Sequence, residues 1–302
     1  MESDRARGVL LGLACGDALG RPVEFKSASA ISTEHGRLDE MVKEGTWNQP
    51  AGTITDDTEQ ALCIARSLVE QQTFDPADIA RRFVAWYDTE PFDIGGMTAR
   101  SLSRLKHGDA WDEAGQHVWE QSREGQNAGN GSVMRCPPLA VPYASDWDRL
   151  AAVSRQSSQI THADPRCTYG CAILNLTIAG LLENTDAPLQ AALDDVNSDA
   201  PDELVTALEP VARGETPSPL ETSGYVVYSL QTALHDSLVA DSAEEAMVTA
   251  VNRGGDTDTI GAIAGAVAGA RFGASQLPER WLSAINEVRE IKSLASQLTS
   301  LS

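Results

Sequence analysis

Two short clusters of carboxylate and hydroxyl side chains stand about 200 residues apart in this 302-residue sequence, Thr55-Asp56-Asp57-Thr58 and Asp256-Thr257-Asp258-Thr259. Each is predicted to open a helix, where a single Asp or Thr is enough to cap the free backbone N–H groups. Paired carboxylates interleaved with hydroxyls exceed that need, and oxygen ligands without Cys or His suit Mg²⁺, Ca²⁺ or Mn²⁺. If the two helix starts face each other, they can hold two cations about 3.5–4 Å apart. The pattern favours a metal site over capping alone.

A third candidate is the glycine-rich segment Gly129-Asn130-Gly131-Ser132-Val133-Met134-Arg135, which predicts a turn entering a helix. Backbone N–H groups at such a helix start can cradle a phosphate, and the Arg135 guanidinium would add positive charge. An ordinary turn is the alternative, and neither a Walker A nor a Rossmann pattern occurs. His162, which follows Thr161, is either a site residue or a structural hydrogen-bonding group.

Two glycine-rich helices are predicted to position these clusters. Glycines recur every fourth residue near both ends of the chain: Gly8, Gly12, Gly16 and Gly20, then Gly261, Gly265 and Gly269. Glycine costs about 1 kcal/mol relative to alanine inside a helix, so this spacing needs a reason. It places the glycines on one helix face, where two backbones can approach closely. We expect a tight core that holds the carboxylates at its ends.

Helical periodicity dominates the rest of the chain, and strand-like alternation is nearly absent. The last helical segment has apolar residues at spacings of three and four between Trp281 and Leu298. Other helices are predicted over Thr58–Gln71, Pro76–Tyr87, Met97–Lys106, Arg149–Gln159, Arg166–Leu182, Glu203–Val211, Gly224–Leu238 and Ala243–Val251. The segment Lys26–Gly52 is predicted to be a long loop. No linker or repeat divides the chain, which indicates one all-α domain over residues 1–302.

The composition limits the partners and the environment. The net charge is −21, and only four of the 23 basic residues are lysines. Such an acidic surface disfavours direct binding to nucleic acid or to an anionic membrane. Acidity with scarce lysine favours a halophilic protein, whose stability is expected to fall when salt is removed, over an ordinary acidic enzyme. Five cysteines without a regular spacing, and a charged N-terminus, predict a cytoplasmic protein with reduced thiols.

Taken together, the sequence resembles the ADP-ribosylglycohydrolases, which include the dinitrogenase-reductase-activating glycohydrolases. The matching segments occur in order between Gly8 and about Gly273: Gly12-Leu-Ala-Cys-Gly-Asp17-Ala-Leu-Gly20 with Glu24, Thr55–Thr58, Gly129–Arg135, Thr161-His162 and Gly254–Thr259. The resemblance implies a compact, single-domain orthogonal helical bundle and a centre of two Mg²⁺ or Mn²⁺ ions. The implied reaction is hydrolysis of the N- or O-glycosidic bond that joins ADP-ribose to a protein side chain or a small molecule.

The resemblance also implies roles for individual residues. The metal ligands would be Thr55, Asp56, Asp57, Asp256, Asp258 and Thr259. Glu24 matches an acid near the metals that the family uses in catalysis or in metal contact. Asp93 matches another acid near the scissile bond more loosely, because Gly96-Met97 stand where more polar residues are expected. Gly129, Asn130, Gly131, Ser132, Met134, Arg135 and His162 would hold the diphosphate and ribose. Tyr225 would line the adenosine side, with a core aromatic as the alternative.

In this reaction the bond between the acceptor and C1″ of ADP-ribose, the anomeric carbon of the terminal ribose, is cleaved. Oxocarbenium character develops at C1″ in the transition state, and nearby carboxylates stabilise it. A water molecule whose pKa is lowered by the cations would attack C1″, while Glu24 or Asp93 transfers the proton. The segment Lys26–Gly52 is then either a lid over the site or an ordinary surface loop.

Two other functions compete with this hypothesis: a non-catalytic ADP-ribose-binding relative, and a metal-dependent phosphohydrolase. The first should have lost ligand carboxylates, and the second would release AMP or phosphate in place of intact ADP-ribose. The expected partner is an ADP-ribosylated protein or a small ADP-ribose conjugate, bound by a monomer. The sequence does not distinguish which acceptor carries the ADP-ribose: an arginine, a serine, an O-acetyl group or a nucleic acid.

Overall fold

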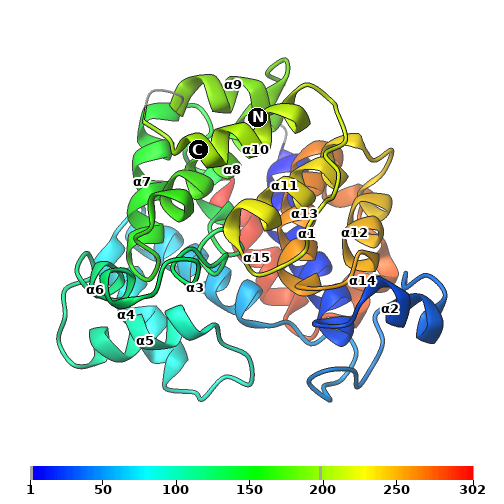
Figure 1. Cartoon of the computed structure of the whole chain (residues 1–302), viewed down its shortest axis with the longest axis horizontal. Helices are drawn as coiled ribbons and strands as arrows, with labels where there is room; N and C mark the ends of the chain where they lie inside the picture. The colour runs from blue at the N-terminus through cyan, green and yellow to red at the C-terminus, as the bar shows by residue number, and fades with distance from the viewer. Residues whose placement is uncertain (1–2, 197–198, 302) are drawn as a thin grey trace.

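The protein folds into α-helices joined by loops and short 3₁₀ turns (Figure 1). The computed structural model describes residues 3–196 and 199–301. Within these ranges extended pairing is limited to isolated bridges, which confirms the all-α class. The helices are α1 Ser3–Gly20, α2 Ala28–His35, α3 Asp56–Gln71, α4 Pro76–Tyr87, α5 Gly96–Lys106, α6 Ala114–Gln121, α7 Trp147–Gln159, α8 Pro165–Leu182, α9 Pro188–Val196, α10 Asp202–Ala212, α11 Val226–Val239, α12 Ala243–Asn252, α13 Thr257–Phe272, α14 Glu279–Ala284 and α15 Val288–Leu298.

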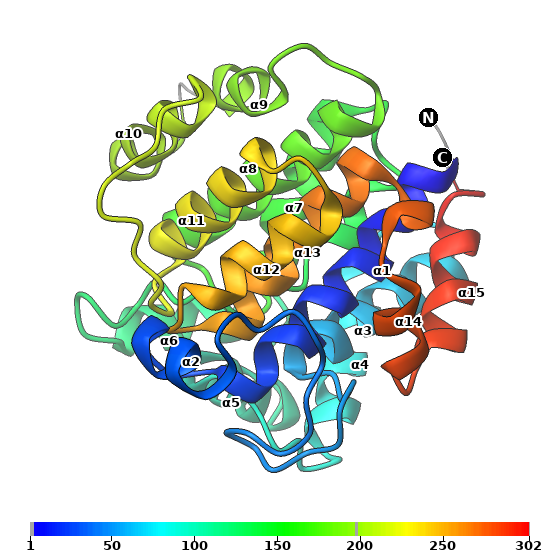
Figure 2. The ribbon, with the colours of Figure 1, turned by 90° about the vertical axis from the view of Figure 1, so that its right-hand side faces the viewer.

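Helices α1 and α13 pack against each other in opposite directions at the centre of the molecule (Figure 2). A Cβ atom added to Gly8 would lie 2.2 Å from the carbonyl oxygen of Gly269. One added to Gly16 would lie 1.8 Å from that of Gly261. The two backbones are therefore closer than any side chain permits, which confirms the tight core predicted from the glycine spacing.

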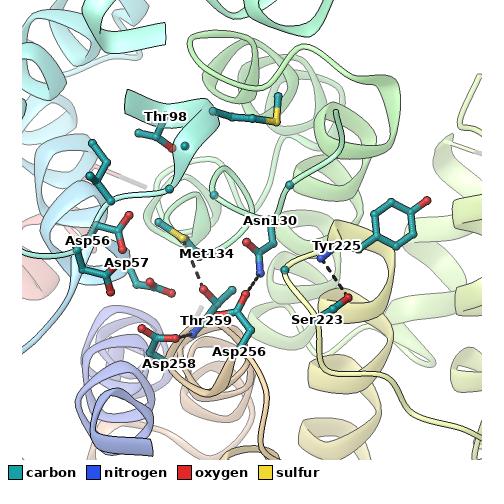
Figure 3. Close-up of a pocket in the computed structure, with 18 of the residues that line it drawn as sticks. Asp56, Asp57, Thr98, Asn130, Met134, Ser223, Tyr225, Asp256, Asp258 and Thr259 are labelled. Atoms are coloured by element: carbon teal, nitrogen blue, oxygen red, sulfur yellow. Dashed lines mark hydrogen bonds between the residues drawn. The ribbon is translucent and has the colours of Figure 1, made fainter. Parts of the chain in front are cut away.

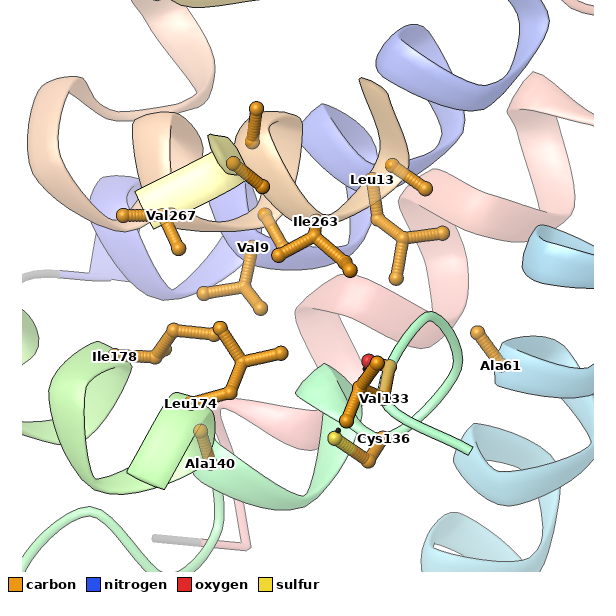
Figure 4. Close-up of a cluster of buried hydrophobic side chains, with 14 of the residues drawn as sticks. Val9, Leu13, Ala61, Val133, Cys136, Ala140, Leu174, Ile178, Ile263 and Val267 are labelled. Carbon is orange, nitrogen blue, oxygen red and sulfur yellow. Dashed lines mark hydrogen bonds between the residues drawn. The ribbon is translucent and has the colours of Figure 1, made fainter. Parts of the chain in front are cut away.

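Apolar side chains of neighbouring helices enclose this central pair. Helix α13 also packs on α8, α11 and α12, and α1 packs on α15. Val9 and Leu13 of α1 meet Ile263 of α13 and Leu174 of α8 in one buried cluster (Figure 4). Burial of apolar surface on this scale is the main favourable term in folding, and it keeps α1 and α13 rigid.

The antiparallel arrangement brings the C-terminal end of α1 to the N-terminal end of α13. The Thr257 hydroxyl donates to the Gly20 carbonyl oxygen at 2.8 Å, which joins the two ends directly. The start of α3 is attached to the same place through Asp17 of α1. The two Asp/Thr clusters, remote in sequence, thereby lie at one end of the central pair.

Most predicted helices are present, with ends shifted by one or a few residues. The helix predicted over the last segment is divided into α14 and α15, because the chain is extended at Ile285, where φ is −69° and ψ is 123°. The long loop predicted over Lys26–Gly52 contains α2 instead. Its Ser27 side chain accepts a hydrogen bond from the Ala30 N–H and caps the helix, and Ile31 is its one fully buried residue. A single apolar contact is too little to produce a periodic pattern.

Helices α6 and α9 were also not predicted. Each has only eight or nine residues, which is shorter than the window of about 11 or more residues over which helical periodicity is recognised. Within the described ranges, no helix has the length and apolar character needed to cross a membrane. All five cysteines are buried and carry free thiols.

Candidate active site and metal centre

A cleft of about 580 Å³ opens at the end of the α1–α13 pair where the two Asp/Thr clusters meet (Figure 3). Its volume lies in the range of small-molecule sites. Six carboxylates line it: Glu24, Asp56, Asp57, Asp93, Asp256 and Asp258. Among the described residues that line the cleft, none is a lysine or an arginine. The lining therefore carries strong negative charge without a protein cation to balance it.

Asp17 of α1 fixes the position of the first cluster. Its carboxylate accepts hydrogen bonds from the backbone N–H groups of Thr55 and Thr58, each at 3.1 Å, and from both threonine hydroxyls. These N–H groups belong to the free first turn of α3, which otherwise needs a local cap. Burial raises the pKa of Asp17 to about 6, although these hydrogen bonds act to lower it. One buried side chain thus ties the α3 start to α1.

With α3 held in this way, Asp56 and Asp57 face the cleft (Figure 3). The Oδ2 atom of Asp56 accepts a hydrogen bond from Gln60 Nε2 at 3.3 Å. The Oδ1 atom of Asp57 is buried and has no hydrogen-bond partner in the structure. The pKa values of both carboxyls are raised well above their ordinary range, first by burial and then by neighbouring carboxylates.

The second cluster lies beside the first, at the start of α13 (Figure 3). Positive φ angles at Gly254 and Gly255 turn the chain into α13. Asp256 then accepts a hydrogen bond from Asn130 Nδ2 at 2.7 Å. Asp258 accepts one from the Thr259 backbone N–H at 2.9 Å. Burial, followed by the charge of Asp57, raises the pKa of Asp258 well above its usual range.

Glu24 and Asp93 complete the acidic cluster. One carboxylate oxygen from each of Glu24, Asp93 and Asp258 lies within 4.8 Å of the other two, a spacing that suits a shared cation. The indole N–H of Trp47 donates to Glu24 Oε2. Burial and then the charge of Asp93 raise the pKa of Glu24 to about 8. The pKa of Asp93 rises to about 7, first by burial and then through Asp17.

The donor set fits divalent cations bound through oxygen. Buried carboxylates without a countercharge are costly, and their raised pKa values reflect that cost. A lysine or arginine would normally balance them, but the described lining holds neither. Carboxylate and hydroxyl oxygens are the ligands that Mg²⁺ and Mn²⁺ prefer. The unpartnered Asp57 Oδ1 atom is available for one further interaction of this kind.

The glycine-rich segment forms another wall, as a turn and not as the predicted helix start. Residues 131–135 form turns that lead into the 3₁₀ helix Pro137–Ala140. The Asn130 N–H donates to the Gly224 carbonyl oxygen at 3.1 Å, which attaches this turn to the loop before α11. A Cβ atom on Gly131 would lie 2.9 Å from Cε1 of His162. The missing side chain leaves the imidazole edge accessible from the cleft.

A chain of hydrogen bonds behind the wall orients His162. Arg135 donates to Gln60 Oε1 at 2.5 Å and to Thr161 Oγ1 at 2.6 Å. The Thr161 hydroxyl, which accepts from Arg135, lies 2.7 Å from Nδ1 of His162, so its own hydrogen can be donated to that atom. In this tautomer the Nε2 atom carries the proton of the neutral ring. Burial, then the charge of Arg135, lowers the pKa of His162 to about 3 and keeps it neutral.

Three predicted site residues do not line the cleft. Arg135 is fully buried, with its guanidinium 4.4 Å from the centre of the Phe83 ring. Its hydrogen bonds are directed at Gln60 and Thr161 in the protein interior and not at the cleft. Ser132 is buried against Ser158, and Thr55 lies between the carboxylates of Asp17 and Asp57. The predicted residues that do line the cleft are Glu24, Asp56, Asp57, Asp93, Gly129, Asn130, Gly131, Met134, His162, Tyr225, Asp256, Asp258 and Thr259.

Tyr225 lies at the side of the cleft away from Asp56 and Asp57 and directly precedes α11 (Figure 3). Its hydroxyl donates to Glu203 at 2.6 Å and accepts from Arg166 at 3.0 Å. Its ring meets Tyr228 edge-on, with ring centroids 5.0 Å apart. The ring is half-buried at the rim of the cleft and also packs against the hydrophobic core.

Sequence reasoning missed several residues that shape the site. Asp17 and Thr161 stand inside the matched segments, but their roles depend on contacts across the fold. Gln60 shows no special pattern on α3. Phe25 and Trp47 line the cleft mouth, and nothing in their sequence neighbourhood marks them. Trp47 belongs to the segment considered as a lid, which is held in place by hydrogen bonds from the buried Arg21 guanidinium to three of its carbonyl oxygens.

Comparison with known proteins identifies the family. The sequence profile described as ADP-ribosylglycohydrolase matches residues 2–302. The chain belongs to the ADP-ribosylglycohydrolase family. It is 34% identical over 300 residues to ADP-ribosyl-[dinitrogen reductase] glycohydrolase of Rhodospirillum rubrum, covering 99% of this chain and 96% of that protein. It is 32% identical over 311 residues to ADP-ribosylarginine hydrolase Tri1 of Pseudomonas putida (strain GB-1). That alignment covers 98% of this chain and 78% of the relative.

A solved structure agrees with this assignment. The chain described as "ADP-ribosylglycohydrolase-related protein complex" is 34% identical to this ADP-ribosylglycohydrolase, with a TM-score of 0.82. The alignment covers 99% of this chain and 98% of that one. The protein is therefore an enzyme that hydrolyses glycosyl bonds of ADP-ribose, in the helical fold of its family.

Proposed function

We propose that this ADP-ribosylglycohydrolase removes ADP-ribose from the guanidinium group of an arginine side chain in a protein. The acidic cleft carries the proposal, because its described lining offers six carboxylates and no basic side chain. A cationic acceptor suits such a lining better than a neutral serine or acetyl group does. The full-length similarity to relatives named as ADP-ribosylarginine hydrolases supports the same acceptor.

Two divalent cations, Mg²⁺ or Mn²⁺, belong to this proposal. The proposed ligands come from the first cluster, Asp56 and Asp57, and from the second, Asp256, Asp258 and Thr259. Thr55 would contribute through its hydroxyl, which donates to Asp57. When bound, the cations supply positive charge that neutralises the carboxylates, orients the ribose and diphosphate oxygens, and increases the acidity of water. The described lining has no lysine or arginine. The positive charge of the two cations would therefore allow an anionic diphosphate to enter the cleft.

Glu24 and Asp93 are proposed as the acids at the scissile bond. Burial raises the pKa values of both, followed by the charge of Asp93 for Glu24, whose pKa reaches about 8, and by the charge of Asp17 for Asp93, whose pKa reaches about 7. One carboxyl oxygen of each lies within 4.8 Å of one from the other, and in the metal-free protein like charges this close do not ionise together. In its protonated form one of the two would donate to the leaving nitrogen, while the other, as a carboxylate, would stabilise the oxocarbenium character at C1″.

The opposite part of the cleft is proposed to hold the nucleotide. Asn130 is fixed between Ser229 and Asp256, with its amide nitrogen 2.9 Å and 2.7 Å from their oxygens. His162 Nε2 offers a neutral donor beside the glycine turn, where a phosphate or ribose oxygen can accept it. The half-buried ring of Tyr225 suits an apolar base at the far end.

The enzyme is proposed to act as a cytoplasmic monomer on an ADP-ribosylated protein. Support for the compartment comes from the five free, buried thiols, which suit a reducing environment.

The test is release of ADP-ribose from an arginine-ADP-ribosylated peptide, with a serine-linked peptide alongside. We expect release with Mg²⁺ or Mn²⁺ in molar KCl, and none in EDTA. Asp57→Asn should lower kcat/KM by at least about a hundredfold, because it removes a carboxylate from the cleft. Glu290→Gln, which removes a surface carboxylate paired with Arg66, is the matched control and should stay active. Release of AMP, or preference for the serine peptide, would contradict the proposal.

A further inference from the structure

Three aromatic rings stand in a row at one mouth of the cleft. The ring centroids of Phe25 and Trp47 are 6.4 Å apart, and those of Trp47 and Phe92 are 5.9 Å apart. Phe25 has 69% of its surface exposed, and both Phe25 and Trp47 line the cleft. We call these three residues the aromatic rim. Nothing in the proposed cleavage step requires the Phe25 ring.

The backbone holds Phe25 in this exposed position at a cost. Its φ of +64° lies in the left-handed region, which is unfavourable for a bulky residue. Two backbone hydrogen bonds maintain it, from the Phe25 N–H to the Gly255 carbonyl oxygen at 2.7 Å and from the Gly255 N–H to Lys26 at 2.8 Å. Strain retained next to a functional site commonly serves that site. The hydrogen bonds also tie the rim directly to the loop that carries Asp256.

The aromatic rim stands beside the acids of the scissile bond. Phe25 follows Glu24 in the chain, Phe92 precedes Asp93, and the Trp47 indole donates to the Glu24 carboxylate. His162 and Tyr225, assigned above to the nucleotide, line the same cleft, and Tyr225 lies on its side away from Asp56 and Asp57 (Figure 3). With the nucleotide on that side and the scissile bond at Glu24 and Asp93, the group attached to C1″ would leave past these rings.

The chemistry of this mouth favours a flat cation. Aromatic faces attract cations through the ring quadrupole, and a guanidinium also stacks on them. Glu24 and Asp93 add negative charge at the base of the rim, and no lysine or arginine of the described lining competes for the rings. A serine or acetyl acceptor has no charge and no planar π system for this interaction.

We propose that Phe25, Trp47 and Phe92 form the acceptor subsite, where aromatic faces receive the guanidinium of the ADP-ribosylated arginine. This inference rests on the proposed arginine specificity and adds the residues that determine it. Phe25, the most exposed ring, covers the guanidinium from the solvent side. The enzyme thereby recognises the acceptor separately from the ADP-ribose.

Substitutions at Phe25 test the subsite. Leucine and tyrosine experience the same backbone strain at this positive φ as phenylalanine does, so the substitutions change the side chain and not the cost of the backbone conformation. Phe25→Leu keeps the apolar character and removes the ring, while Phe25→Tyr restores a ring. Steady-state kinetics would use an arginine-ADP-ribosylated peptide, with agmatine as a competing guanidinium compound. Calorimetric titration with free ADP-ribose reports on the nucleotide end. Val239→Ala, at another exposed apolar position, is the surface control.

For Phe25→Leu we expect the KM of the arginine peptide and the inhibition constant of agmatine to rise about five- to tenfold. The Kd of ADP-ribose should change less than twofold, and Phe25→Tyr should recover most of the loss. Unchanged KM in an active Phe25→Leu enzyme would overturn the subsite and leave the arginine specificity intact. A parallel rise in the Kd of ADP-ribose would also overturn it, because the ring would then serve the nucleotide. A wild-type enzyme that cleaves only the serine peptide would instead overturn the proposed function, and the subsite with it.

Discussion

At the scale of single residues, the site depends on a carboxylate that does not line the cleft. Asp17 binds two backbone N–H groups and two hydroxyls at the start of α3, and these contacts determine where Asp56 and Asp57 point. Asp17 is a positioning residue, because it acts on the reaction only through its neighbours. These hydrogen bonds make a buried carboxyl group tolerable in the apolar second half of α1.

Asp17→Asn tests this role. The asparagine amide has the shape of the aspartate side chain. It replaces one accepting oxygen with an N–H₂ group, which cannot accept hydrogen bonds from the Thr55 and Thr58 N–H groups. We expect the free energy of unfolding to fall by about 2–4 kcal/mol, and Mg²⁺ or Mn²⁺ affinity to fall at least about tenfold. Chemical denaturation and metal titration measure the two effects.

The matched control is Asp75→Asn at the start of α4. Asp75 caps that helix by accepting from the Asp78 N–H at 2.9 Å, and asparagine caps equally well. This change should leave metal affinity unaltered. Equal metal affinity in Asp17→Asn and wild type would show that α3 holds its position without Asp17.

At the scale of secondary-structure elements, the close contact of α1 and α13 sets the geometry of the site. Each glycine on one helix faces a carbonyl group on the other, so the separation of the two helices is determined by backbone contact. The first and second Asp/Thr clusters depend on this separation, one through Asp17 and the other directly.

Gly16→Ala should therefore damage both the fold and the site. Its Cβ atom would lie 1.8 Å from the Gly261 carbonyl oxygen, and a backbone atom cannot move aside as a side-chain end can. We expect a loss of about 3 kcal/mol or more in the free energy of unfolding, at the upper end of overpacking effects. Thermal and denaturant unfolding provide the measurement.

Gly96→Ala is the control for this element. Gly96 begins α5, its φ is not positive, and an added Cβ would have no heavy atom within 4 Å. Its stability should equal or slightly exceed that of the wild type, by about 1 kcal/mol or less. A loss in Gly16→Ala no larger than about 1 kcal/mol would mean that the helices can separate without cost.

At the scale of the whole molecule, buried apolar residues from α1 to α15 form one contiguous cluster. We infer that the chain acts as one domain, because no segment of residues 3–196 and 199–301 has a separate core. The net charge of −21 adds self-repulsion over the entire surface. Loss of stability on removal of salt stays a prediction from this composition.

The buried carboxylates make the stability of the metal-free enzyme depend on pH. Their folded-state pKa values lie above the unfolded values, reaching about 6 for Asp17, about 7 for Asp93 and about 8 for Glu24. The folded state therefore binds more protons than the unfolded state between about pH 4 and pH 8. In EDTA and molar KCl, we expect the Tm to fall as pH rises from 5 to 8.5.

Divalent cations should reverse this trend. They bind the deprotonated carboxylates, so their affinity rises with pH and binding releases protons. With saturating Mg²⁺ or Mn²⁺, the gain in Tm should be small at pH 5 and largest near pH 8. A metal-free Tm that rises with pH across this window would show that the acidic cluster does not limit stability.

The local pattern of the sequence determined the helical class, the close glycine-bearing pair and the two Asp/Thr clusters. Each of these depends on residues a few positions apart, so helical spacing alone predicts which side chains share a face. Helices such as α2, which bury little, leave no such pattern. Only the tertiary structure decided that Arg135 is directed into the core, that Asp17 holds α3, and that Phe25 and Trp47 meet at the cleft mouth. These contacts join segments that are far apart in the chain or set by loop conformation. Their geometry follows from how the helices pack and is not encoded in any short stretch of sequence.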